Sequence, residues 1–170
     1  MLMNLPFDSI YLAIWSSIGD AEEIFDSAQK FLEQHGVKIL RKSSNYLTEP
    51  YGWVAKNMFT NAVWEIDFTH FGRNQELGIR NQASSPDSWL STSNSPEYQT
   101  AIKLLSICQA CEAAHGRTRE KRWGDRTLDI DILTFWDLRC ETDELTIPHP
   151  EIHKRGFVKK PLSELLDSEE

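Results

Sequence analysis

The stretch that decides the fold is RTREKRWGDRTLDIDILTF, at residues 117–135. Its first part, residues 117–126, carries five cationic side chains against two acidic ones. Such a run, interrupted by a tryptophan and a glycine, predicts a mobile, positively charged loop. From Thr127 onward apolar and polar residues alternate strictly. This alternation is typical of a half-buried strand.

The predicted strand places two carboxylates side by side. Residues i and i+2 of a strand project from the same side, so Asp129 and Asp131 share one face and the apolar residues between them share the other. Neighbouring carboxylates raise each other's pKa unless a cation lies between them. Hard oxygen ligands beside arginine and lysine suggest Mg²⁺ and a polyphosphate. The alternative is a solvated acidic strand face that follows a basic loop.

A longer motif within this stretch, RWGDRTLDIDI at residues 122–132, resembles the signature of the 6-hydroxymethyl-7,8-dihydropterin pyrophosphokinases. Weaker matches extend over about residues 9–165. The resemblance implies an enzyme of folate biosynthesis. It implies Mg²⁺- and ATP-dependent transfer of pyrophosphate to the hydroxymethyl group of the reduced pterin, which gives the pterin diphosphate and AMP.

Composition narrows the class of protein. A chain of 170 residues suits one domain, here residues 1–170 with a loop insertion at about 72–98. The net charge of −8 argues against a general nucleic-acid-binding protein. Three cysteines are too few for a disulfide framework and predict buried thiols. No stretch approaches the ~20 apolar residues of a membrane span, and no signal peptide is evident. We therefore expect a cytoplasmic protein, acting as a monomer, without a membrane or nucleic-acid partner.

The order of expected elements defines the fold class. Strand, helix, strand, strand, helix and strand follow one another, which is the arrangement of the ferredoxin-like α+β fold. An antiparallel or mixed sheet should therefore lie between helices in α-β-α layers. Strands are expected at 9–17, 37–42, 59–68, 127–135 and 144–147, helices at 20–36, 101–114 and 161–166, loops at 43–56 and 72–98, a turn at 137–142, and an extended segment at 155–158.

The resemblance also implies roles for individual residues. Asp129 and Asp131 match the family's ligands for two Mg²⁺ ions, and Arg119, Arg122 and Arg126 match cationic positions that contribute to catalysis. The expected ATP-binding residues are Gln109, Glu112, Arg119, Arg122, Trp123, Arg126, Ile132, Thr146, His149 and Arg155. The expected pterin-binding residues are Thr48, Pro50, Phe59, Asn61 and Phe157. Without the resemblance, Gln109 and Glu112 belong to a solvated helix stripe, and the two phenylalanines belong to the core.

Departures from the family pattern leave two other functions open. Trp15 stands where the family has glycine, Glu144 where many members have arginine, and Asp125 where proline is usual. Phe59 replaces a tyrosine. One alternative is a catalytically weakened homologue that binds a nucleotide or a partner protein. The other is a nucleotidyltransferase that uses Ser16 and Ser17 with the aspartate pair. A turnover assay with ATP and the reduced pterin separates these functions.

Overall fold

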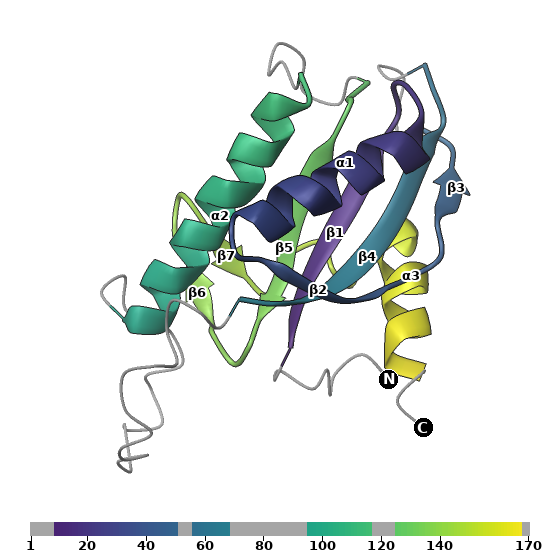
Figure 1. Ribbon diagram of the computed structural model, residues 1–170. Coiled ribbons are helices and arrows are strands. Elements are labelled where there is room, and N and C mark those ends of the chain that lie inside the picture. The colour runs from purple at the N-terminus through teal and green to yellow at the C-terminus, as the bar shows by residue number, and fades with distance from the viewer. Residues whose placement is uncertain (1–8, 51–55, 69–94, 117–124, 168–170) are drawn as a thin grey trace.

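The structure is a computed structural model that describes residues 9–50, 56–68, 95–116 and 125–167. Figure 1 shows a twisted sheet with helices on both sides. In chain order the elements are β1 (Ile10–Ser16), α1 (Ala21–Gln34), β2 (Lys38–Lys42), β3 (Tyr46–Thr48), β4 (Phe59–Asp67), α2 (Pro96–Ala114), β5 (Asp129–Phe135), β6 (Cys140–Glu141), β7 (Thr146–Ile147) and α3 (Gly156–Asp167).

The main sheet has the strand order β2-β4-β1-β5, and β3 pairs with β4 beside it. All of its pairings are antiparallel. Helices α1 and α2 cover one face, and α3 lies against the other (Figure 1). The predicted α+β, ferredoxin-like fold with α-β-α layers is therefore confirmed. None of the helices in the described part of the chain has the length and apolar character needed to cross a membrane.

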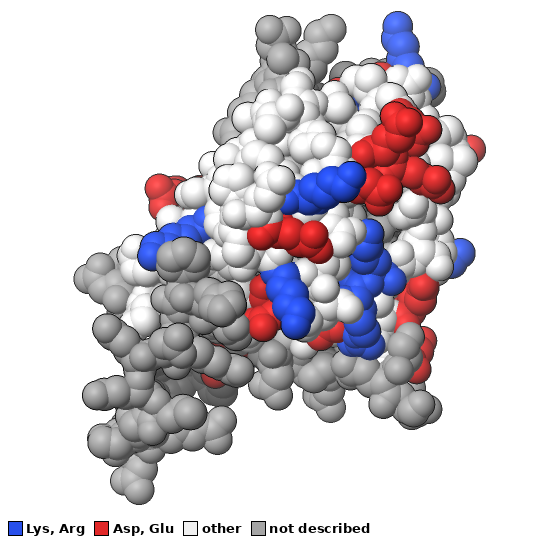
Figure 2. Space-filling view, viewed as in Figure 1, with Lys and Arg blue, Asp and Glu red and all other residues white. Residues whose placement is uncertain are grey.

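The outer surface formed by α1 and α2 carries charges of both signs. Figure 2 shows acidic and basic side chains interspersed there, with wide uncharged areas between them. Across the described residues in this view, no extended basic field is present. The described residues of this face therefore mix the two signs of charge.

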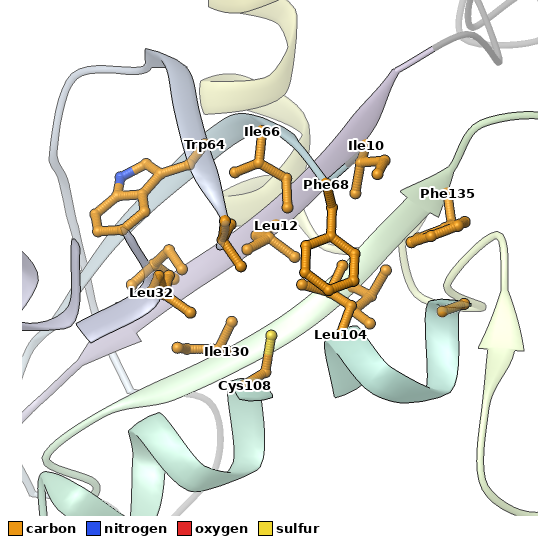
Figure 3. Close-up of a cluster of buried hydrophobic side chains, with 14 of the residues drawn as sticks. Ile10, Leu12, Leu32, Trp64, Ile66, Phe68, Leu104, Cys108, Ile130 and Phe135 are labelled. Carbon is orange, nitrogen blue, oxygen red and sulfur yellow. The ribbon is translucent and has the colours of Figure 1, made fainter. Parts of the chain in front are cut away.

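The core has two parts because β1 is buried on both faces. Ile10, Leu12 and Ile14 point toward α1 and α2, and the residues between them point toward α3. Figure 3 shows the larger part, in which side chains of β1 and β4 meet Leu104 and Cys108 of α2. All three cysteines are free and buried, which confirms the prediction of buried thiols.

Capping residues set the starts of the first two helices. The Asp20 carboxylate accepts hydrogen bonds from the backbone N–H groups of Glu22 at 2.9 Å and Glu23 at 3.2 Å, as its position before α1 predicts. Ser95 Oγ accepts one from Tyr98 N at 3.2 Å, with Pro96 in the first turn. Helix α2 therefore begins before the predicted residue 101 and takes up the end of the predicted 72–98 loop. Residues 72–94 of that loop lie outside the described residues.

Three local predictions were wrong. The predicted loop at 43–56 contains the short strand β3, and the predicted turn at 137–142 contains β6. The segment at 155–158, predicted to be extended, is mostly the first turn of α3. A proline disfavours helix in the residue before it, here Lys160. Burial of Val158, Leu162 and Leu165 against the sheet nevertheless maintains a helix through the proline.

Candidate active site

Strand register brings the predicted metal and pterin residues into one row. Trp15 of β1 lies directly opposite Asn61 of β4 on one side and Asp129 of β5 on the other. In the next row of the same face, Ala13 lies between Val63 and Asp131. Directly opposed residues of antiparallel strands project to the same face. Both aspartates and Asn61 therefore project from the sheet face that α3 partly covers.

The two aspartates have different surroundings. Asp129 is buried, and the guanidinium of Arg126 pairs with its carboxylate. The Asp131 side chain is 32% exposed, and its Oδ2 lies 3.6 Å from His149 Nε2. The carboxylates thus have the cationic neighbour that their spacing predicts. Asp131 therefore carries the more accessible carboxylate of the two, and Asp129 is already paired with a cation.

Backbone contacts fix the orientation of His149. Its N–H donates to Leu133 O of β5 at 2.8 Å, which ties the segment after β7 to the aspartate-bearing strand. Its Nδ1 accepts a hydrogen bond from Glu151 N at 3.2 Å, so the ring proton is on Nε2, which faces Asp131. Burial and the nearby charge of Arg155 hold the pKa of His149 below its ordinary value, against the opposing effect of Glu151. At neutral pH His149 is therefore an uncharged hydrogen-bond donor.

The predicted pterin residues gather around Asn61. Its buried amide nitrogen lies 2.7 Å from Thr48 Oγ1, 3.1 Å from Phe59 O and 3.2 Å from Tyr46 O. These contacts join β3 to β4 at the edge where the two strands pair. Phe59 and Phe157 both pack against the apolar cluster beneath α3, and Pro50 lies two residues after the end of β3. An amide on a sheet face that also carries aromatic rings suits the polar edge and flat faces of a fused heterocycle.

Of the predicted nucleotide-binding residues on α2 and β5, some are exposed and others are buried. Gln109 is exposed, whereas Glu112, three residues later, is buried and accepts a hydrogen bond from Ile130 N at 2.8 Å. Ile132 lies in the core under α1 and α2, on the face opposite the aspartates. Thr146 begins β7 and is half-buried. The structure therefore does not bring Glu112 and Ile132 to the face that carries Asp129 and Asp131.

The Asp125 carboxylate joins three segments of the chain at this end of the sheet. The sequence showed Asp125 only as a departure from the family pattern. Asp125 accepts hydrogen bonds from Ser17 Oγ at 3.3 Å and from the backbone N–H groups of Asn57 at 3.1 Å and Lys56 at 3.2 Å. Desolvation alone raises the pKa of Asp125, but these hydrogen bonds outweigh it and lower that pKa. Ser17 N also donates to Arg126 O at 2.8 Å. No local sequence pattern predicts these contacts of Asp125, because they form only where three distant segments of the chain meet.

Part of the predicted site falls outside the described residues. Arg119, Arg122 and Trp123 lie there, with the rest of the loop at 117–124. Within the described part of the chain, no group of three or more His, Cys, Asp and Glu side chains is placed to hold a metal ion. The aspartate pair therefore provides two protein carboxylates. This number suits an ion that takes its remaining ligands from phosphates and water, as Mg²⁺ usually does.

Comparison with known proteins identifies the family. The family model described as 7,8-dihydro-6-hydroxymethylpterin-pyrophosphokinase matches residues 90–167. A Bacillus subtilis protein, 2-amino-4-hydroxy-6-hydroxymethyldihydropteridine pyrophosphokinase, is 36% identical over 156 residues, which are 91% of this chain and 76% of the relative. The chain belongs to this pyrophosphokinase family. A Methylorubrum extorquens pyrophosphokinase of the same name is 31% identical over 91% of this chain and 80% of the relative.

A fused relative shows that the family also occurs within longer proteins. The Lactococcus lactis protein named bifunctional protein FolKE is 31% identical over 94% of this chain, which corresponds to 38% of the relative. With the family established, the predicted enzyme class, pyrophosphokinase, is confirmed. The family match includes α2, β5 and α3, and so it covers both aspartates, His149 and Phe157.

Proposed function

We propose that the protein transfers a pyrophosphoryl group from ATP to the hydroxymethyl oxygen of 6-hydroxymethyl-7,8-dihydropterin and releases AMP. The observation that carries the proposal is the row formed by Asn61, Trp15 and Asp129, with Asp131 in the next row. It puts an amide suited to a pterin edge on the same sheet face as the β5 aspartates suited to a metal-bound phosphate, with only β1 between the two strands. The family membership supplies the substrate class.

The aspartate pair is the proposed site of two Mg²⁺ ions. Asp129 and Asp131 offer hard carboxylate oxygens on one strand face, where the phosphates of ATP can complete the ligand set. Bound Mg²⁺ supplies charge neutralisation on the phosphates. Arg126 pairs with Asp129 in this structure and is close enough to the pair to turn its guanidinium fork toward a phosphate.

The remaining residues divide between the two substrates. Thr48 and Asn61 lie where they can bind the polar edge of the pterin, and Pro50, Phe59 and Phe157 provide apolar walls. His149 offers a neutral N–H toward Asp131 and the adjacent phosphates, and Arg155 adds positive charge on the same side. The other residues proposed to bind ATP, from the resemblance, are Gln109, Arg119, Arg122, Trp123 and Thr146.

The product nucleotide tests the proposal directly. The protein is incubated with Mg-ATP and 6-hydroxymethyl-7,8-dihydropterin, and nucleotides and pterins are separated chromatographically. AMP formed in equal amount to a pterin diphosphate is the expected result. The matched control is 6-methyl-7,8-dihydropterin, which lacks the attacking hydroxyl and should yield no AMP. Production of ADP, or AMP formation that is equal with both pterins, would contradict the proposal.

Trp15 is the observation that favours a second function, a catalytically weakened homologue that binds nucleotide or a partner protein. It places an indole in the row that carries Asn61 and Asp129. Nucleotide binding without pterin-dependent AMP formation in the same assay would support that function. We do not favour a nucleotidyltransferase acting on a nucleic acid, because the net charge of −8 opposes a polyanionic substrate. We further propose that the chain acts as a cytoplasmic monomer with one domain over residues 1–170.

A further inference from the structure

Trp15 occupies the centre of the proposed pterin site. It is the penultimate residue of β1 and lies directly between Asn61 on β4 and Asp129 on β5. Its side chain projects from the same sheet face as theirs and is only 7% exposed. A bulky bicyclic ring is thus packed between the residue proposed to bind the pterin edge and one of the residues proposed to bind the metal.

The indole also contacts one of the residues proposed to stack on the pterin. The rings of Trp15 and Phe157 meet edge to face, with their centroids 5.4 Å apart and their planes at 80°. This geometry is a favourable one for an aromatic pair. The guanidinium carbon of Arg155 lies 6.0 Å from the Trp15 ring centroid and 5.5 Å from that of Phe157. Together the two aromatic rings and the guanidinium form a packed group.

A pterin and this packed group require the same space. To use the proposed site, the pterin must place its polar edge at Asn61 and its flat face on Phe157. Both residues adjoin the indole, which is itself a planar, fused two-ring system of a size similar to the pterin. We propose that Trp15 is an internal competitor for the pterin: its indole must leave Phe157 before the pterin ring can reach Asn61. The inference rests on the proposed function and adds a residue that sets pterin affinity.

The competition acts on the pterin. The cost of separating Trp15 from Phe157 is added to the binding of the pterin and raises its Kd and KM. Because Arg155 of the packed group is also proposed to bind ATP, the Kd of the pterin is measured at saturating nucleotide, so that a change in nucleotide affinity does not alter it. If Trp15 instead forms a wall that holds the pterin, its removal weakens pterin binding. The direction of the change therefore distinguishes a competitor from a wall.

The experiment measures pterin binding to Trp15→Ala, Trp15→Gly and Trp15→Phe. Each variant is saturated with Mg²⁺ and a non-hydrolysable ATP analogue, and the Kd of 6-hydroxymethyl-7,8-dihydropterin is determined by calorimetry. Trp15→Ala should bind about three- to tenfold more tightly than the natural chain, the range that loss of one edge-to-face pair permits. Trp15→Phe keeps an aromatic ring and a well-packed strand, so it provides the answer if the smaller variants fail to fold.

Trp64→Phe is the matched control. Trp64 is also buried and also makes an edge-to-face pair, with Phe25 at 6.1 Å, but on the sheet face covered by α1 and α2. Its replacement should leave the Kd of the pterin unchanged. Unchanged or weaker pterin binding in folded Trp15 variants overturns the inference while leaving the proposed function intact. If neither the natural chain nor any variant binds the pterin, the proposed function fails and the inference fails with it.

Discussion

Replacement of the buried carboxylate on α2 should weaken the whole fold. Glu112 is 3% exposed, and its Oε1 accepts a hydrogen bond from Ile130 N at 2.8 Å. Ile130 belongs to β5, which lies at an edge of the main sheet, and among the described residues the helix provides an acceptor where no further strand pairs. Glu112 also lies in the last turn of α2, where a negative charge is unfavourable to the helix dipole. The hydrogen bond to Ile130 offsets that cost.

The magnitude follows from the unsatisfied donor that the substitution creates. Glu112→Ala leaves the Ile130 N–H buried without this acceptor, which costs about 1–3 kcal/mol in the free energy of unfolding. For a chain of this length, each kcal/mol corresponds to a change in Tm of about 2–4 °C. The variant should therefore melt about 2–12 °C below the natural chain. Glu112→Gln retains an acceptor oxygen and should lose less.

Thermal unfolding followed by circular dichroism measures the effect, and Gln109→Ala is the matched control. Gln109 lies three residues earlier on the same helix and is exposed, so its replacement should change stability by no more than about 0.5 kcal/mol. The family resemblance assigns both residues to ATP, whereas the structure gives Glu112 a structural contact. If Glu112→Ala melts like Gln109→Ala and instead raises the KM for ATP, the structural argument is refuted.

Three further predictions concern the aspartates and the thiols. Asp129→Asn and Asp131→Asn should each reduce pterin-dependent AMP formation by at least about 100-fold with little change in Tm, because each removes the charge of a proposed metal ligand. Near-natural rates in either variant would reject the metal site. Folding lowers the pKa of Asp125, so the ionised carboxylate stabilises the folded state. This stabilisation is complete above the ordinary carboxyl pKa and is lost as the pH falls through the lower pKa of the folded state. Tm measured from about pH 6 to pH 3 should therefore fall less steeply in Asp125→Asn, and parallel curves would show that the hydrogen bonds contribute nothing. Burial raises the pKa of Cys111 to about 12 and also raises the pKa of the other two thiols, so a thiol reagent should label the cysteines only after unfolding.

Sequence patterns correctly predicted the elements that have one apolar and one polar face or a clear capping residue. The alternation from Thr127 correctly placed Asp129 and Asp131 on one face of β5, and Asp20 correctly marked the start of α1. Patterns of this kind depend only on residues close together in the chain. The short strand β3 was missed because it has three residues and forms only by pairing with β4.

The arrangement of the site depends on contacts that no local pattern contains. The row of Asn61, Trp15 and Asp129 requires the register of three strands that are distant in sequence, and one residue of slippage would move every side chain to the opposite face. The contact of Glu112 with Ile130 likewise depends on which side of α2 meets the sheet edge. A sequence shows that Glu112 belongs to a polar stripe, but it does not show which member of the stripe becomes buried.

The position of β5 explains why one strand can serve both stability and chemistry. Its residues Ile130 and Ile132 pack in the core beneath α1 and α2, while Asp129 and Asp131 project from the other face. Its outer edge is held by Glu112, whose partner Ile130 lies between the two aspartates in the chain. Because the backbone between the carboxylates is held from the α2 side, their separation is fixed by the core. A substitution that loosens this contact should therefore reduce both stability and the precision with which the aspartates meet a metal-bound phosphate.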